Sequence, residues 1–205
     1  MPEAVPAIHV YGVPVRPFRY HKGMSGSACN SPSLYRVTLG DQYDRLPPVL
    51  RAFHDLSAGG RAQGDLCITR GVGRLRGLCA DLMRLPRAAD CVTVRLEVKA
   101  ARGAERWVRD FGPHRLVTDQ WHRNGLLVEA AGPMRFGFRL TASETQMAFT
   151  MERCWLLGLP VPVALAPRVS AVVTGRADAW WTVVTVDAPL LGLLARYEGE
   201  MAPLL

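Results

Sequence analysis

Residues 92–99 read Val-Thr-Val-Arg-Leu-Glu-Val-Lys, and apolar and polar side chains alternate at all of these positions. Successive side chains of a β-strand point to opposite faces, so a period of two predicts a strand with one dry face and one wet face. The turn residues Ala101-Arg102-Gly103 follow, and a partner strand is expected at Glu105–Phe111. The two segments form the first predicted hairpin.

Strand patterns separated by short turns continue on both sides of this hairpin. They lie at Gly64–Thr69, Arg115–His122, Leu126–Ala130, Met134–Thr141, Gln146–Trp155, Val169–Thr174 and Trp180–Asp187, with a closing segment that ends near Met201. Successive hairpins of this length favour an antiparallel meander. We therefore predict a β-rich α+β fold, in which two N-terminal helices pack on a strongly curved antiparallel sheet or a partly closed barrel.

Two segments have the period of an amphipathic helix, Pro47–Leu56 and Gly73–Leu85. The apolar stripe of the second consists of Leu75, Leu78, Cys79, Leu82 and Met83. Arginines lie across the helix axis, so two interpretations are open: a helix that packs on the sheet, or an interfacial helix on anionic lipid. We favour the packed helix, because a curved sheet needs a cover for its apolar face.

Residues 1–32 are rich in proline and lack apolar periodicity, which predicts an extended or disordered tail. Residues 33–205 then form a single β-rich domain. The N-terminus lacks the hydrophobic segment of a secretory signal, so we expect a cytoplasmic protein. No apolar run reaches the roughly 18 residues of a membrane-spanning helix. Membrane contact is therefore not expected, although the interfacial reading of 73–85 leaves it open.

The net charge is +7, from 25 basic and 18 acidic residues. All the basic residues except Lys22 and Lys99 are arginine, a bias typical of codon composition. Nucleic-acid-binding proteins cluster basic residues on one face with aromatic side chains between them. The densest basic group, between Arg70 and Arg87, belongs to the second predicted helix, and we predict no nucleic-acid partner.

Metal and catalytic motifs are absent from the sequence. The five cysteines include no Cys-x-x-Cys pair, which predicts free, mostly buried thiols and no metal site. There is no G-x-S-x-G elbow, H-E-x-x-H motif or Walker A loop, and we predict no cofactor. The one candidate catalytic residue is His54, as a general base next to Asp55. Adjacent helix residues do not face one another, however, which argues against a working pair.

Two five-residue segments echo one another after strands. They are Leu156-Leu157-Gly158-Leu159-Pro160 and Leu190-Leu191-Gly192-Leu193-Leu194. Two copies predict a turn that is used twice, not a repeat architecture.

A candidate ligand site begins on the strand Glu105–Phe111, where Trp107, Arg109 and Phe111 share one face. An arginine between two aromatic rings is suited to bind a ligand carboxylate or phosphate. The alternative is a structural arginine that pairs with Glu129. The remaining candidates are large apolar residues on the inner faces of later strands: Phe136, Phe138, Met147 and Phe149.

Several short motifs follow one another along the chain. They are Ser33-Leu34-Tyr35-Arg36, Leu46-Pro47-Pro48, Phe53-His54-Asp55, Glu105 to Gly112, Leu157-Gly158-Leu159-Pro160 and Pro189-Leu190-Leu191-Gly192. On these residues the chain, from about 33 to 203, resembles an uncharacterised bacterial family, the domain-of-unknown-function family numbered 4166. The resemblance implies no activity, but such domains look like C-terminal partners of NAD(P)-binding reductase-like domains in some cases. This chain has no G-x-G-x-x-G motif, so such a reductase would be a separate protein.

Three functions are compatible with these observations. The leading hypothesis is a module that holds a small apolar or amphipathic molecule, lipid-like or an acid, in a barrel-like cavity. The first alternative is an enzyme or accessory domain that works with a separate NAD(P)-dependent reductase through His54, Arg109 and Glu129. The second is a protein-interaction module, which an exposed apolar patch would favour.

Overall fold

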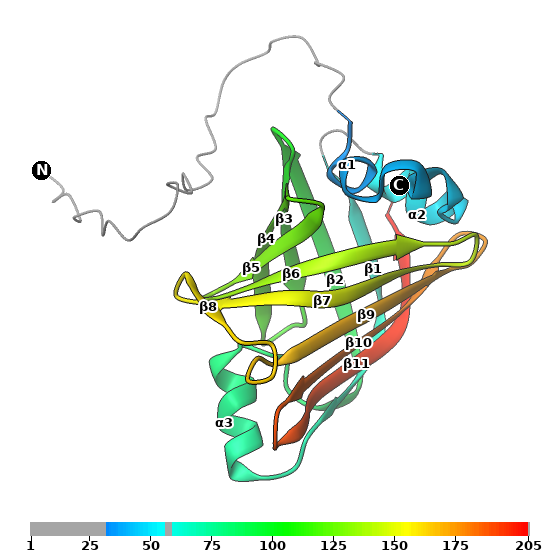
Figure 1. The fold of residues 1–205 in the computed structure, drawn as a ribbon. Coiled ribbons are helices and arrows are strands. Elements are labelled where there is room, and N and C mark those ends of the chain that lie inside the picture. Colours follow the sequence, from blue (N-terminus) through cyan, green and yellow to red (C-terminus); the bar gives the residue numbers. More distant parts are fainter. Residues whose placement is uncertain (1–31, 56–58, 205) are drawn as a thin grey trace, which may run out of the picture.

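Ten antiparallel strands close into a barrel in the computed structural model, which describes residues 32–55 and 59–204 (Figure 1). The order around the barrel is β1-β2-β3-β4-β5-β6-β7-β9-β10-β11, and β11 pairs with β1 to complete the ring. The short β8 pairs with β7 outside this ring. The predicted antiparallel meander is confirmed, and its two ends are joined.

The strands agree closely with the segments predicted from the alternating pattern. They are β1 (Arg61–Arg70), β2 (Ala89–Ala101), β3 (Ala104–Asp110), β4 (Arg115–Arg123), β5 (Leu126–Ala131), β6 (Met134–Ala142), β7 (Gln146–Leu156), β8 (Leu159–Val161), β9 (Arg168–Gly175), β10 (Trp180–Ala188) and β11 (Gly192–Pro203). Only β8 was not expected, because three residues that include Pro160 are too few to show an alternation.

The alternation places apolar side chains inside the barrel. Val94, Leu96 and Val98 of β2 are buried, as are Met134, Phe136, Phe138 and Leu140 of β6. These side chains belong to one continuous core that extends from the barrel interior to the helices at its end. The interior is therefore mostly filled by the strands' own side chains.

Closure joins the first and last strands of the barrel. The pairing of β1 with β11 runs from Ala62 opposite Pro203 to Arg70 opposite Ala195. It is extended by a hydrogen bond in which the Leu204 N–H donates to the Arg61 carbonyl oxygen at 2.8 Å. The seam between β6 and β7 is also continuous, so the ring has no open edge.

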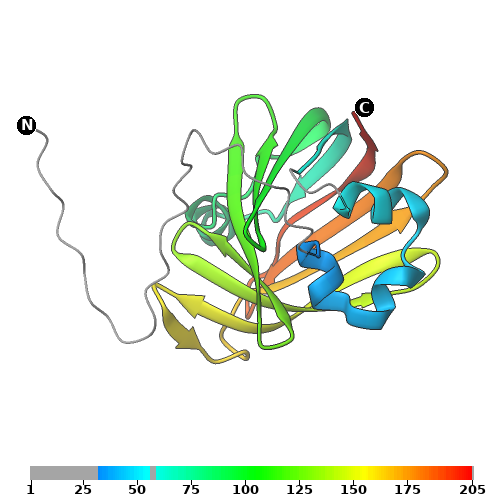
Figure 2. The same cartoon turned by 90° about the horizontal axis from the view of Figure 1, so that it is seen from above.

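Helices lie at both ends of the barrel (Figures 1 and 2). At one end, α1 (Leu34–Leu39) contacts β4, β5 and β6, while α2 (Pro48–His54) contacts β9; the short 3-10 helix η1 (Gly40–Arg45) joins them. The predicted helix at 47–56 is confirmed as α2, but α1 was not predicted because six residues are too few to show a helical period. The predicted tail lies outside the described residues, apart from Pro32.

At the opposite end, α3 (Arg74–Leu82) occupies the second predicted helix, but its orientation was predicted wrongly. Leu75, Leu78 and Leu82 are 66%, 66% and 67% exposed. The residue that α3 buries is Ala80, which packs with residues of β10 and β11. The prediction assumed an open apolar sheet face, and a closed barrel has no such face outside.

Arginines attach α3 to the barrel. The Arg70 guanidinium donates hydrogen bonds to the carbonyl oxygens of Leu85 and Pro86. The Arg76 guanidinium donates to the carbonyl oxygen of Leu191, in the turn between β10 and β11. Arg76, which was placed on the polar face of this helix, therefore points toward the barrel, and Arg70 of β1 binds the segment after α3. No helix among residues 32–55 and 59–204 is long and apolar enough to cross a bilayer.

The four described cysteines have free thiols, but the prediction that most are buried was wrong. Cys154 is buried, Cys79 is partly buried, and Cys67 and Cys91 are exposed on the strand surface. Cys29 lies outside the described residues.

Candidate functional site

An internal cavity of about 170 Å³ lies in the barrel, between the helices at one end and the segment after α3 at the other. All nine candidate site residues line it: His54, Trp107, Arg109, Phe111, Glu129, Phe136, Phe138, Met147 and Phe149. They come from α2, from four strands (β3, β5, β6 and β7) and, for Phe111, from the position directly after β3, so the inward alternation of the strands brings most of them together. Their role in binding stays a prediction.

The wall of the cavity is mainly apolar. The ring centroids of Phe136 and Phe138 are 6.1 Å apart, and the Phe138 and Phe149 rings meet edge to face at 6.1 Å. Met147 is almost fully buried beside them. Further apolar lining comes from β9 and β10, which supply Val173 and Trp180 among others.

Arg109 and Glu129 form an ion pair in the wall. Both terminal nitrogens of Arg109 lie 3.4 Å from Glu129 Oε1, and Arg109 Nη1 also donates to Thr118 Oγ1 at 3.0 Å. The guanidinium carbon lies 5.0 Å from the Trp107 ring centroid, which adds a cation–π contact. The expected pairing with Glu129 is present. Phe111 instead meets the Tyr197 ring edge to face at 6.2 Å.

Glu105 and Trp107 lie on the same face of β3, and their side chains are hydrogen-bonded. The indole Nε1–H donates to Glu105 Oε2 at 2.9 Å. Burial raises the pKa of Glu105 to about 7, although the indole hydrogen bond opposes this shift. The carboxyl group therefore gains or loses its proton close to neutral pH.

His54 lies over the polar part of the cavity. Its imidazole stacks on the Tyr35 ring at 3.7 Å between centroids, with 27° between the ring planes. The residue is 6% exposed, and burial lowers the pKa of His54 to about 3, so the ring is neutral at physiological pH. Among the described residues, its side chain has no hydrogen-bond partner, and because no fully buried side-chain nitrogen or oxygen lacks one, the ring nitrogens keep accessible surface.

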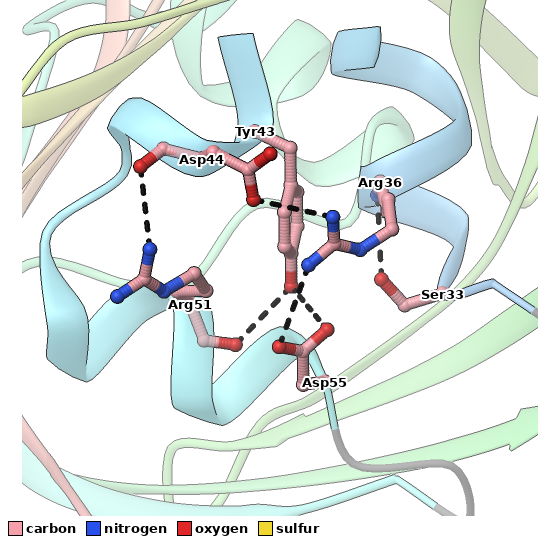
Figure 3. Close-up of polar contacts among 6 residues, drawn as sticks. All are labelled: Ser33, Arg36, Tyr43, Asp44, Arg51 and Asp55. Carbon is pink, nitrogen blue, oxygen red and sulfur yellow. Dashed lines mark hydrogen bonds and ion pairs between the residues drawn. The ribbon is translucent and has the colours of Figure 1, made fainter. Parts of the chain in front are cut away.

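A polar cluster fixes the helix that carries His54 (Figure 3). The Tyr43 hydroxyl lies 2.8 Å from Asp55 Oδ1 and 3.2 Å from the Arg51 carbonyl oxygen, at the end of α2. Arg36 of α1 covers the Tyr43 ring at 4.3 Å and pairs with Asp44 at 3.2 Å. Asp55 thus accepts from Tyr43 and is not the partner of His54.

Five polar lining residues were not predicted: Tyr35, Thr118, Gln120, Thr182 and Tyr197. The Tyr35 hydroxyl donates to Gln120 Oε1 at 3.0 Å. Burial, followed by the negative charges of Glu105 and Glu129, raises the pKa of Tyr35 well above its ordinary value. Thr118 and Gln120 could have been found from the sequence, because they share the inward face of β4 with the buried Leu116.

Tyr197 of β11 resembles His54 in one respect. Its ring is buried and lines the cavity, and its hydroxyl has no hydrogen-bond partner within the described part of the chain. Burial raises the pKa of Tyr197, and the charges of Arg109 and Glu129 act on it with opposite signs. Two neutral polar groups on different elements therefore present unused hydrogen-bonding capacity at the same cavity.

The arrangement favours binding over acid–base catalysis. A general base works best when its pKa lies near the operating pH, and a pKa of about 3 makes His54 a weak base. No group of three or more metal-ligating side chains occurs in the ranges that the structure describes. Neutral hydrogen-bonding groups beside a paired charge and an apolar wall are suited to orient a small molecule.

Comparisons with known proteins add a family and a distant structural likeness. Comparison with the curated proteins gave no match. Among solved structures, a protein of unknown function from the DUF3598 family of Nostoc punctiforme is similar, with a TM-score of 0.47 and 10% identity. The likeness covers 71% of this chain and 47% of that chain, so this chain spans about half of that protein's length. The family described as a domain of unknown function, DUF4166, matches residues 46–201, and the chain therefore belongs to this family.

Proposed function

We propose that the barrel is a binding module for a small amphipathic molecule. Its apolar part would lie among Phe136, Phe138 and Phe149. Its polar group would form hydrogen bonds with His54 and Tyr197, beside the Arg109–Glu129 pair.

The observation that carries the proposal is the unused hydrogen-bonding capacity of His54 and Tyr197 at one cavity. No fully buried side-chain nitrogen or oxygen of the described residues lacks a hydrogen-bond partner, so the partnerless polar atoms of His54 and Tyr197 keep accessible surface. If the two positions only filled an apolar core, phenylalanine would stabilise the fold more than histidine or tyrosine. A ligand with hydrogen-bonding groups would supply partners to these two residues.

The size of the cavity limits the buried part of the ligand. At about 170 Å³, it is close to the engineered cavity of about 150 Å³ that binds benzene. This volume favours one ring or a short branched chain over a long acyl chain.

The charges in the wall favour a neutral polar group. Arg109 is already paired with Glu129, and His54 is neutral. A free carboxylate or phosphate would place a second negative charge close to Glu129. A hydroxyl, a carbonyl or a protonated carboxyl group avoids this repulsion; the carbonyl accepts hydrogen bonds from the neutral residues, and the other two groups both donate and accept.

The first experiment is native mass spectrometry of the full chain, purified under mild conditions, with extraction and identification of whatever is bound. A stoichiometric small molecule with an apolar body and a polar group supports the proposal. An unliganded mass, together with no binding in the titration described next, overturns it.

The second experiment compares three ligands of equal ring size by isothermal titration: toluene, benzyl alcohol and benzoate. We expect benzyl alcohol to bind most tightly, and His54→Phe and Tyr197→Phe to reduce its affinity to that of toluene. The matched control is His122→Phe, since His122 is an exposed histidine at the end of β4. Equal affinity for toluene and benzyl alcohol, unchanged by the two variants, would remove His54 and Tyr197 from the site.

A further inference from the structure

The two ends of the barrel differ in the chemistry of their turns. Because every strand is antiparallel to its neighbours, the turns fall alternately at the two ends. At the end covered by α1 and α2, the turns include Arg102-Gly103 and Asn124-Gly125. At the opposite end, where α3 follows β1, the turns are Phe111–His114, Gly132-Pro133, Leu157-Gly158 and Pro189–Leu191. Two of these turns therefore carry leucine where a polar residue is the usual solution.

Leu157 and Leu190 occupy backbone conformations that do not favour leucine. Their φ angles are 52° and 65°, in the left-handed region where glycine and asparagine predominate. Leu157 is 76% exposed and Leu190 is fully exposed, so packing of these side chains does not offset the backbone strain. These are the two echoed segments of the sequence, and both place a leucine at the tip of a turn on the same end of the barrel.

The exposed stripe of α3 lies at the same end of the barrel. Leu75, Leu78 and Leu82 recur at spacings of three and four, which places them on one face along roughly 10 Å of helix. The Arg76 guanidinium donates to the carbonyl oxygens of both Val72 and Leu191. These bonds hold the start of α3 against the turn that carries Leu190. We call Leu75, Leu78, Leu82, Leu157 and Leu190 the leucine end.

Positive charge surrounds part of the leucine end. Arg74, Arg84 and Arg87 are exposed on and after α3. Asp81, the acidic residue on α3, already pairs with Arg70 at 2.7 Å. An apolar stripe flanked by arginines matches the boundary between headgroups and acyl chains of an anionic bilayer. A protein partner would need acidic residues around its own apolar patch, a narrower requirement than an anionic lipid surface.

We propose that the leucine end docks on the surface of an anionic lipid bilayer. The five leucines would enter the boundary between headgroups and acyl chains, and the exposed arginines would contact lipid phosphates. The inference goes beyond ligand binding and does not rest on it. It takes up the alternative that the sequence left open, an interfacial helix on anionic lipid, while Ala80 packs α3 against the barrel.

The position of the cavity gives this surface a consequence. Met83 and Leu85, directly after α3, line the cavity. A barrel that docks through α3 therefore places this end of the cavity next to the bilayer, from which a sparingly soluble molecule could enter.

The test is co-sedimentation of the full chain with phosphatidylcholine vesicles, with and without phosphatidylglycerol. The informative variant is Leu157→Asn/Leu190→Asn, because asparagine tolerates the left-handed conformation and the fold is expected to keep its thermal stability. The matched control is Val117→Asn/Leu204→Asn, which removes two exposed apolar side chains elsewhere on the molecule.

We expect binding to the vesicles that contain phosphatidylglycerol, reduced at high salt. The leucine variant should bind at least about tenfold more weakly, and the control should bind like the native chain. A second variant, Arg74→Gln/Arg84→Gln/Arg87→Gln, should lose the preference for the anionic lipid.

Three results would overturn the proposal. The first is no binding to either vesicle. The second is binding that the leucine variant leaves unchanged. The third is a dimer in analytical ultracentrifugation that the leucine variant abolishes while vesicle binding is absent, which would assign the leucine end to contact between two copies of the chain.

Discussion

The imidazole of His54 stacks on the phenol ring of Tyr35, and the Tyr35 hydroxyl in turn donates to Gln120 on the barrel wall. Two helices and a strand are thereby joined through rings that burial keeps neutral. The stack positions, in the cavity wall, an imidazole that has no hydrogen-bond partner among the described residues. Most of the expected effects below depend on this neutral, buried setting.

Replacement of His54 is expected to change how stability depends on pH. The folded state keeps His54 neutral down to a pKa of about 3, whereas the unfolded chain takes up a proton near 6.5. The unfolded state therefore binds more protons as the pH falls from 6.5 toward 3, and stability is lost over that window. At 1.36 kcal/mol per unit, the loss between pH 6.5 and pH 5 is about 2 kcal/mol. Urea unfolding gives the free energy of unfolding of the native chain and of His54→Phe, and the difference between the two should change by this amount in favour of the variant between pH 7 and pH 5. An identical difference at both pH values would contradict the prediction.

Glu105→Gln is expected to act in the opposite sense. The unfolded carboxyl ionises near 4.5 and the folded one near 7, so the native chain loses stability as the pH rises through this window. The loss approaches about 3 kcal/mol at pH 8. Glutamine keeps an oxygen that accepts from the Trp107 indole. At pH 4 the free energy of unfolding of the variant should match that of the native chain, and at pH 8 it should be higher. If the difference between the two chains is the same at both pH values, Glu105 ionises normally.

Removal of one member of the Arg109–Glu129 pair should cost more than removal of both. Their side chains are 19% and 17% exposed, so the carboxylate left by Arg109→Met is largely desolvated. We expect a loss of about 2 kcal/mol for the single variant and recovery of most of it in Arg109→Met/Glu129→Leu. Denaturant unfolding of the two single variants and the double variant measures the coupling. Additive losses would show that the two charges do not depend on one another.

Ala171→Leu tests the cavity without touching a polar residue. Ala171 lines the cavity on β9, and the larger side chain fills part of its volume. Because the space is already present, we expect the free energy of unfolding to change by less than about 1 kcal/mol. Affinity for benzyl alcohol should fall at least about tenfold. Ala148→Leu, on the neighbouring strand β7 and outside the cavity lining, is the matched control. Loss of affinity in both variants would point to a general change in the barrel.

The strands can be predicted from the sequence because the residues of each strand alternate between apolar and polar, according to which side chains are buried. The alternation in 92–99 states which side chains face inward, and the same logic assembled all nine candidate residues around one cavity. Barrel closure could not be read in this way. The pairing of Ala62 with Pro203 joins opposite ends of the domain, and a local pattern does not name a strand's neighbour.

The errors have a physical cause as well. The leucine stripe of α3 was recognised correctly, but an apolar stripe does not say what it faces, and the closed barrel gives it no apolar wall. Tyr35 and Tyr197 were missed because each is one polar atom on a large apolar ring, so it follows the core pattern until a neighbour is known. The period of a sequence therefore predicts which side chains share a face, whereas the residues that they contact are known only from the structure.

The seam between β1 and β11 also governs how the chain must fold as it leaves the ribosome. Once β1 and β2 have emerged they are able to form a hairpin, but the other edge of β1 stays unpaired until β11 has been made, almost a whole domain later. Contacts so distant in sequence slow folding, and an exposed strand edge invites pairing with other chains. The nascent barrel thus spends its synthesis as an open sheet, the stage at which a chaperone would matter most.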